Sequence, residues 1–169
     1  MTTTVSPHRT TDTAPNPPRA LHFTSRAELD APPTVVWSMV ADYGRDSQWR
    51  RGVRTMQPCP AGLVRLGTTT DEVVRLGGRT YRSRGIVTEV DEGRRFAWQT
   101  TSGVSARGWR QVRPLPTGGT TVELHLEVDV RGLQVLMKPL LRRMLGASLA
   151  GDVERLRALV DADRGRAPR

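Results

Sequence analysis

The last long apolar segment of the chain is the feature that most constrains its fold. Over about 133–162, large apolar residues return every three or four positions, which places them along one side of an α-helix. At ~1.5 Å per residue such a helix is about 40 Å long, so it needs a wide sheet to bury its apolar side. The stripe consists of Leu136, Met137, Leu140, Leu141, Met144, Leu145, Leu149, Val153, Leu156 and Val160.

The segments before this helix predict that sheet. We expect a first strand over 21–31 and further strands over about 63–76, 79–90, 94–101, 104–114 and 120–130. The loops between them are short and rich in glycine, which favours antiparallel neighbours. In strand 120–130, valines and leucines share one face, while Glu123, His125, Glu127 and Asp129 share the other. We therefore expect His125 on the solvated outer face.

Two prolines mark the change from the first strand to a pair of short helices. Pro32 and Pro33 end the strand, and proline is tolerated in the first turn of a helix, where its missing N–H costs no hydrogen bond. Helical spacing then runs to Gly44, and a second helix is predicted over about 46–52. These helices carry Trp37 and Trp49, and we expect them to plug one end of the sheet.

Length and composition indicate one domain with polar tails. The 169 residues suit a single core. Residues 1–19 predict a disordered tail, 20–161 the domain, and 162–169 a short polar tail. No apolar run is long enough to cross a bilayer and no hydrophobic signal segment opens the chain, so we expect a cytoplasmic protein. The single cysteine, Cys59, excludes an internal disulfide.

The charge is strongly basic, at +9, and only one of the 26 basic residues is a lysine, Lys138. This skew, with abundant alanine, glycine and valine, is typical of a bacterial protein from a GC-rich genome. A basic surface favours anionic partners, such as the surface of a membrane contacted peripherally. Nucleic acid is disfavoured, because the arginines are spread over every segment and aromatic residues are few.

Several stretches resemble the START-like (SRPBCC) helix-grip superfamily, in its polyketide cyclase/dehydrase and lipid-transport group. They are APPTVVW at 31–37, the segment from Asp42 to Trp49, Gly67, GIVTEVDEGRRFAW at 85–98, RPLPTGGTTVEL at 113–124, and the terminal helix with Leu156-Arg157. The resemblance covers about 21–161. It implies an α+β, Bet v 1-like fold in which a curved antiparallel sheet wraps a long C-terminal helix.

The resemblance also implies a cavity between sheet and helix for a hydrophobic or amphipathic ligand. Its walls are expected from the apolar face of strand 120–130, from strand 94–101 and from the start of the long helix, while Trp49 resembles the family's tryptophan near the cavity mouth. For each residue the alternative is a plain core position. The candidates are Trp49, Tyr81, Phe96, Trp98, Trp109, Arg110, Leu124, Leu126, Met137, Leu140, Leu141 and Met144.

Strand 104–114 leaves its register open. If Trp109 faces inward, so do Arg107 and Gln111; if Val112 faces inward, so does Arg110. A bulge near Gly108 is a third solution. An inward arginine needs an anionic partner, either a carboxylate of the protein or a ligand phosphate or enolate, unless it reaches solvent at the strand end. The orientation of Tyr81 is also left open: its side chain either offers a phenol to a ligand or lies on the outer face.

Three functions compete. The first is binding or transport of a hydrophobic small molecule such as a lipid, a polyketide or an aromatic. The second is a polyketide aromatase/cyclase-type enzyme that works without a cofactor, and the third is a basic surface for nucleic acid or an anionic membrane. We find no histidine cluster with metal-ligand spacing, no nucleophile motif and no phosphate loop in the sequence, so we expect neither metal nor cofactor. The oligomeric state is left open.

Overall fold

The computed structural model describes residues 20–116, 118–130 and 138–166. The predicted tail 1–19 and the cavity candidate Met137 lie outside the described residues. The long helix begins at Lys138 among the described residues and continues to Arg166, so most of the segment predicted as a polar tail belongs to the helix.

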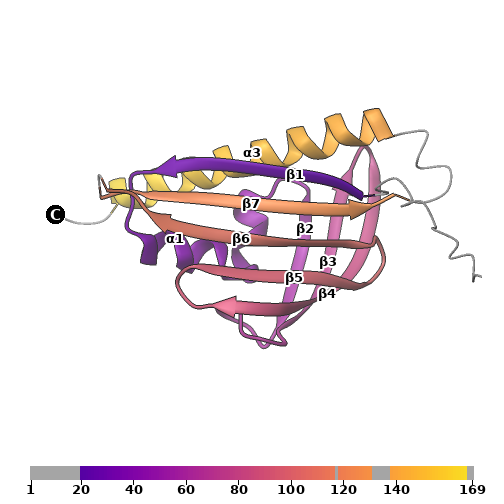
Figure 1. Ribbon diagram of the computed structural model, residues 1–169, viewed down its shortest axis with the longest axis horizontal. Coiled ribbons are helices and arrows are strands. Elements are labelled where there is room, and N and C mark those ends of the chain that lie inside the picture. Colours follow the sequence, from indigo (N-terminus) through magenta and orange to yellow (C-terminus); the bar gives the residue numbers. More distant parts are fainter. Residues whose placement is uncertain (1–19, 117, 131–137, 167–169) are drawn as a thin grey trace, which may run out of the picture.

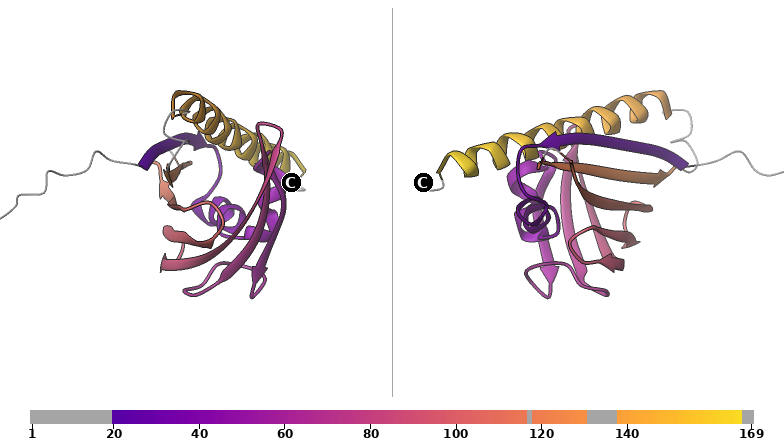
Figure 2. Two further views of the ribbon diagram at one scale, coloured as in Figure 1. Left: turned by 90° about the vertical axis from the view of Figure 1, so that its right-hand side faces the viewer. Right: turned by 60° about the vertical axis from the view of Figure 1, so that its left-hand side comes forward.

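The protein is one seven-stranded antiparallel sheet in the order β1-β7-β6-β5-β4-β3-β2, with a long helix lying across it (Figure 1). The sheet is strongly curved, and the short helices lie inside the curve (Figure 2). This is the predicted fold. The elements are β1 Ala20–Leu29, α1 Pro33–Val40, η1 Tyr43–Arg45, α2 Asp46–Trp49, β2 Val53–Cys59, β3 Thr69–Leu76, β4 Arg79–Asp91, β5 Arg95–Ser102, β6 Ala106–Pro114, β7 Thr120–Asp129 and α3 Lys138–Arg166.

The two short helices are confirmed, but both end earlier than expected. Helix α1 starts at Pro33 and stops at Val40, before Gly44. The chain then turns because the Asp42 side chain accepts a hydrogen bond from the backbone N–H of Gly44, at 2.9 Å. This turn is the start of η1, and α2 follows it directly and ends at Trp49.

Strand β2 is the element that the sequence did not reveal. We expected a single strand over 63–76, whereas the structure has β2 at Val53–Cys59 and β3 at Thr69–Leu76. Strand β2 lies at the edge of the sheet and contains Pro58. An edge strand tolerates proline because one side of its backbone needs no partner. Because this stretch is short, polar and contains a proline, its sequence did not predict a strand.

Helix α3 has two unlike halves. In the second half Val153, Leu156 and Val160 are at most 1% exposed and join the main core. From Lys138 to Gly151, in contrast, none of the helix residues is fully buried, although the apolar stripe continues there. Leu141, Leu145 and Leu149 pack against Leu21 and Phe23 of β1 but are only partly buried. The first half of α3 therefore covers a space that side chains do not fill.

The register of β6 decides the ambiguity of strand 104–114. Val112 is buried in the core and Arg110 points to the same concave side, so Trp109 faces outward. Over Ala106–Pro114 the pairing with β5 and β7 has no irregularity, so the bulge considered near Gly108 is not formed. Gly108 instead makes room for Trp98, since a Cβ there would lie 2.9 Å from the indole ring and 2.3 Å from the carbonyl oxygen of His125.

We expect Gly108→Ala to lower the free energy of unfolding by about 1–3 kcal/mol, because the added methyl group meets backbone and a packed ring. The matched control is Gly146→Ala in α3, where the new Cβ meets the Phe23 ring at an ordinary 3.7 Å. That change should stabilise by up to about 1 kcal/mol, the helix-propensity gain of alanine over glycine. Urea unfolding measures both; equal effects would contradict the tight Trp98 contact.

Candidate ligand-binding site

A cavity of about 110 Å³ lies between the concave face of the sheet and the first half of α3. Its lining is apolar on the sheet and mixed on the helix side. Trp109 and His125 stack on each other on the opposite face of the sheet, so they border the cavity through their backbone. The lining residues are Trp49, Arg50, Val74, Leu76, Trp98, Trp109, Arg110, Leu124, His125, Leu126, Leu145, Ser148, Leu149 and Asp152.

A wall of charged and aromatic side chains separates this cavity from a second, smaller hollow of about 30 Å³. Arg50, Trp98 and Arg110 line both spaces. The smaller hollow continues toward Tyr43 and Ser83. These side chains therefore divide the space on the concave side of the sheet into two cavities, and we refer to them and their ion-pair partners as the partition.

The centre of the partition is a buried ion pair between β6 and α2. Arg110 donates to both carboxylate oxygens of Asp46, at 2.7 and 2.6 Å, and to the backbone carbonyl of Val40 at 2.8 Å. The side chains are only 6% and 0% exposed. Such two-pronged pairing satisfies both charges where water is absent. The anionic partner required for an inward arginine is thus a carboxylate of the protein.

Three aromatic rings surround this guanidinium. The Arg110 Cζ atom lies 4.9 Å from the ring centre of Tyr43, 5.0 Å from that of Trp49 and 5.5 Å from that of Phe96. Rings at these distances attract a cation through their π-electrons. Burial raises the pKa of the Tyr43 phenol, although the positive charge of Arg110 opposes this effect. Tyr43 is therefore a neutral phenol at physiological pH.

A second arginine extends the ion pair into a network. Nη1 of Arg50 lies 2.7 Å from Oδ2 of Asp46 and 2.8 Å from Oε1 of Glu72. Burial by itself would lower the pKa of Arg50, but the attraction of Glu72 and Asp46 outweighs it and raises the pKa. The chain of Arg110, Asp46, Arg50 and Glu72 alternates in sign, so its charges compensate and the partition carries little net charge.

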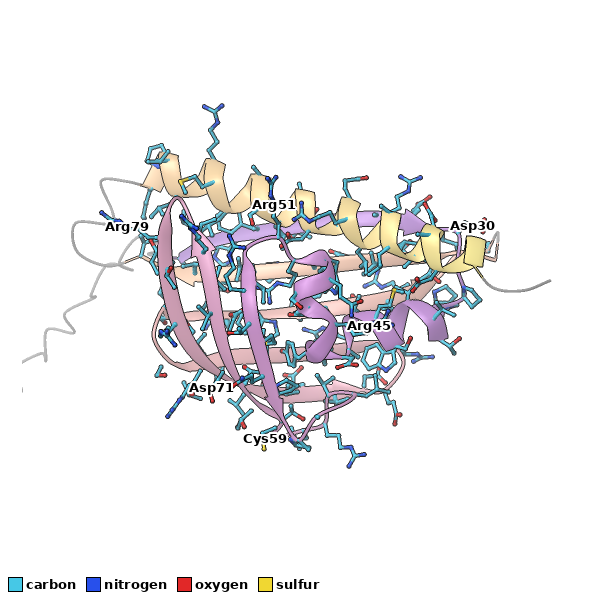
Figure 3. The ribbon with its side chains drawn as sticks, turned by 180° about the vertical axis from the view of Figure 1, so that it is seen from behind. Asp30, Arg45, Arg51, Cys59, Asp71 and Arg79 are labelled. Atoms are coloured by element: carbon cyan, nitrogen blue, oxygen red, sulfur yellow. The ribbon has the colours of Figure 1, made fainter. Side chains whose placement is uncertain are left out.

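Asp152 connects this region to α3. Its Oδ1 accepts a hydrogen bond from the backbone N–H of Arg51 at 3.1 Å and also pairs with Arg155, whose Nε donates to the carbonyl oxygen of Trp49 at 2.9 Å. Arg51 lies beneath α3 in the view from behind (Figure 3). Burial raises the pKa of Asp152, although the attraction of Arg50 opposes this. These bonds join α2 to the middle of the long helix.

Trp49 has an unused donor. The residue is fully buried and borders the cavity, yet its indole Nε1 has no hydrogen-bond partner among the described residues. A buried N–H without an acceptor costs about 1–3 kcal/mol. An oxygen of a bound ligand or a water molecule is the kind of partner that would remove this cost.

Six of the predicted cavity residues border the cavity, and the other candidates among the described residues lie elsewhere. Those at the cavity are Trp49, Trp98, Trp109, Arg110, Leu124 and Leu126. Phe96 is buried in the core, while Leu140 is 49% exposed. Leu141 packs against β1, and Met144 lies against Gly77. Tyr81 is 37% exposed and shares its sheet face with Ser83. That any of these side chains contacts a ligand stays a prediction.

Sequence reasoning did not identify the acidic half of the partition. Asp46 lies in a short polar segment, and nothing local distinguishes it from a solvated helix-start residue. Glu72 is likewise one of two adjacent acids in a predicted strand, and nothing in that segment marks it as buried. The available signal was indirect: an inward Arg110 requires an anionic partner, and the short helix carrying Asp46 is an element that can supply one.

A curved antiparallel sheet, a long helix across its concave side and a cavity between them define the START-like helix-grip class of proteins. The sequence model of one family, described as polyketide cyclase / dehydrase and lipid transport, matches residues 20–161. The chain therefore belongs to this family. No curated protein matches it.

Solved structures share the fold at low sequence identity. TTHA0849 from Thermus thermophilus is 18% identical, with a TM-score of 0.74, and the match covers 85% of this chain and 99% of that one. A START superfamily protein from Mycobacterium smegmatis is 16% identical, with a TM-score of 0.71 and coverage of 83% and 97%. The Zhui aromatase/cyclase of a Streptomyces species is 16% identical, with a TM-score of 0.71 and coverage of 88% and 97%. At these identities the likeness concerns the fold. Within the described residues, no helix is long and apolar enough to span a membrane.

We expect Arg110→Met and Asp46→Asn each to lower the free energy of unfolding by about 3–5 kcal/mol. Arg110→Met removes the two-pronged partner of the buried Asp46 and leaves it with Arg50 alone, and Asp46→Asn leaves the buried Arg110 without an anion. Asp71→Asn is the control. It breaks an ion pair of similar length, 2.9 Å to Arg84, whose side chains are 64% and 72% exposed. Exposed pairs contribute at most about 1 kcal/mol. Chemical denaturation would contradict the network if Arg110→Met cost no more than Asp71→Asn.

The raised pKa of Asp152 predicts that the stability of the protein depends on pH. Because its pKa is raised in the folded state, the folded protein binds the proton more tightly than the unfolded chain, and this contribution to stability is lost as pH rises above the ordinary aspartate range. Asp152→Asn cannot ionise. The stability of the variant relative to the wild type should therefore increase from pH 4 to pH 7 in urea titrations. A relative stability that falls over this range would show that ion pairing with Arg50 and Arg155 dominates instead.

Proposed function

We propose that the protein binds a hydrophobic or amphipathic small molecule in the cavity beneath the first half of α3. The observation that carries this proposal is the change along α3. The apolar stripe is continuous, but only its second half is fully buried, while the leucines of its first half are only partly buried against β1. A half-buried apolar face over a hollow is unfavourable, since its surface stays in contact with solvent. A guest in the cavity would bury that face.

The size of the cavity limits the guest. Pockets for drug-sized ligands measure about 300–1,000 Å³, whereas this cavity measures about 110 Å³. Of the ligand types suggested by the sequence, an aromatic compound of a single ring fits best without rearrangement. A lipid or a polyketide chain requires the first half of α3 to move outward. The absence of fully buried residues from Lys138 to Gly151 makes this half the cheaper one to displace.

The lining suggests that one end of the guest is polar. Leu124, Leu126 and Leu149 offer apolar surface, while Ser148 and the free N–H of Trp49 offer hydrogen bonds. Arg110 is already paired with Asp46, so a full negative charge on the ligand would find little uncompensated positive charge. A neutral hydroxyl or carbonyl oxygen suits this environment better.

An aromatase/cyclase-type activity is the second candidate. It is supported by the Arg110 guanidinium and the Trp49 ring at the cavity wall, since a fixed cation can stabilise an enolate oxygen as it forms. The pairing of Arg110 with Asp46 reduces this stabilisation. The fold of the Zhui aromatase/cyclase is also similar. The test is incubation with a linear poly-β-ketone thioester followed by product analysis. Faster appearance of cyclised product with the wild type than with Arg110→Met, both folded, would favour the enzyme; unchanged rates would favour the binder.

A cytoplasmic location stays a prediction.

Ser148→Phe should abolish ligand binding, because the added ring occupies the cavity, while Ala147→Phe places the same ring on the exposed side of the same helix turn and should leave binding intact. The probe is phenol, one ring with one hydroxyl group, titrated by calorimetry. Native mass spectrometry of protein purified from cells gives a second readout. Retained phenol binding in a folded Ser148→Phe variant, or no guest and no binding in the wild type, would contradict the proposed site.

A further inference from the structure

The convex face of the sheet carries a cluster that the cavity does not use. His22 on β1 lies directly opposite Glu127 on β7, and His125 lies two residues before Glu127 on the same face. One candidate ligand atom of each side chain lies within 4.8 Å of the others. Among the described residues this is the group of histidine and acidic side chains that can hold a metal ion. Residues 22 and 125 are too far apart in the chain for any local motif to reveal it.

Neighbouring side chains hold two of the three ligands in place. The ring of His125 stacks on Trp109, with centroids 5.2 Å apart and planes 10° from parallel, and its Nδ1 lies 3.0 Å from Oγ1 of Thr24. Oε1 of Glu127 is taken by Arg107, which leaves Oε2 directed toward Nδ1 of His22, at 3.4 Å. Metal-binding histidines and carboxylates usually have such outer partners, which fix the orientation of the ligand atoms.

We propose that His22, His125 and Glu127 form a binding site for Zn²⁺ or a similar divalent transition metal. Two imidazole nitrogens and one carboxylate oxygen form a ligand set that zinc accepts, with a water molecule in the fourth position. Ligand atoms around tetrahedral zinc are about 3.3 Å apart, so the cluster must contract by rotation of a side chain. His22 allows this, since its side chain is 54% exposed.

The electrostatics of the cluster contain one favourable and one opposing contribution. The carboxylate of Glu127 attracts a cation, and its Oε2 is directed toward His22 rather than toward Arg107. Arg107 opposes binding, because its guanidinium shares Glu127 and repels a cation. Arg95 lies farther away, over the outer ring of Trp109. Arg107 therefore tunes the affinity of the site.

A metal bound on the convex face would affect the cavity through the strands that carry both sites. Strand β1 is at the edge of the sheet and is held there by its pairing with β7. On the concave side the same two strands carry Phe23 and Leu126, beneath the first half of α3. Crosslinking His22 to β7 would fasten the edge strand. The zinc site itself does not depend on the function proposed for the cavity.

The experiment is a calorimetric titration of the full chain, without a histidine tag, with Zn²⁺, supported by visible absorption of the Co²⁺ form. The wild type should bind about one ion per chain. His22→Ala, His125→Ala and Glu127→Gln should each weaken binding about tenfold or more. His8→Ala, which removes the remaining histidine of the sequence, and Glu123→Gln, which changes another acid on the same face of β7, should not.

Arg107→Gln distinguishes loss of ligands from loss of fold. Removing the competing guanidinium should tighten Zn²⁺ binding several-fold, an effect that a damaged structure would not produce. Far-ultraviolet circular dichroism checks the fold of each variant. The proposal is overturned if Zn²⁺ does not bind stoichiometrically, if His22→Ala and His125→Ala leave the affinity unchanged, or if His8→Ala abolishes binding.

Discussion

The buried pair of Arg110 and Asp46 is the interaction on which the arrangement of the interior depends. It binds the middle of β6 to α2, and the same guanidinium reaches the last turn of α1 through the carbonyl oxygen of Val40. Because a buried charge without a partner is far costlier than a missing apolar contact, the short helices cannot slide along the sheet. They close one end of the curved sheet, whereas the other end is covered by the first half of α3.

This division explains why α3 behaves as two halves. Where the short helices support it, Val153, Leu156 and Val160 are packed into a dry core. On the N-terminal side of Asp152, whose bonds to Arg51 and Arg155 join α3 to α2, the described residues leave a cavity under the helix. The molecule therefore combines a stable end with a hollow end. That combination suits a binding protein, because the packed half can carry the stability while the hollow half accommodates a guest.

Much of the fold follows from the sequence by periodicity alone. The apolar stripe at 133–162, the alternation in strand 120–130 and the two prolines at 32–33 were enough to predict an antiparallel sheet, a long helix and two short ones. The missed strand, Val53–Cys59, is an edge strand, and an edge strand needs neither alternation nor freedom from proline. Leu124 and Leu126 border the cavity, as the alternation in strand 120–130 leads one to expect, whereas alternation left the orientation of Trp109 and Arg110 open.

The sequence by itself determined the apolar face of strand 120–130 and of the long helix, and that an inward Arg110 needs an anionic partner. Only the tertiary structure decided which carboxylate serves, how large the cavity is, and that His22 meets Glu127 and His125 across two strands. The physical reason is the range of the interactions. Periodicity reports the environment of each residue along its own element, whereas ion pairs, cavities and metal ligands depend on distances between elements, which are set when all of them pack together.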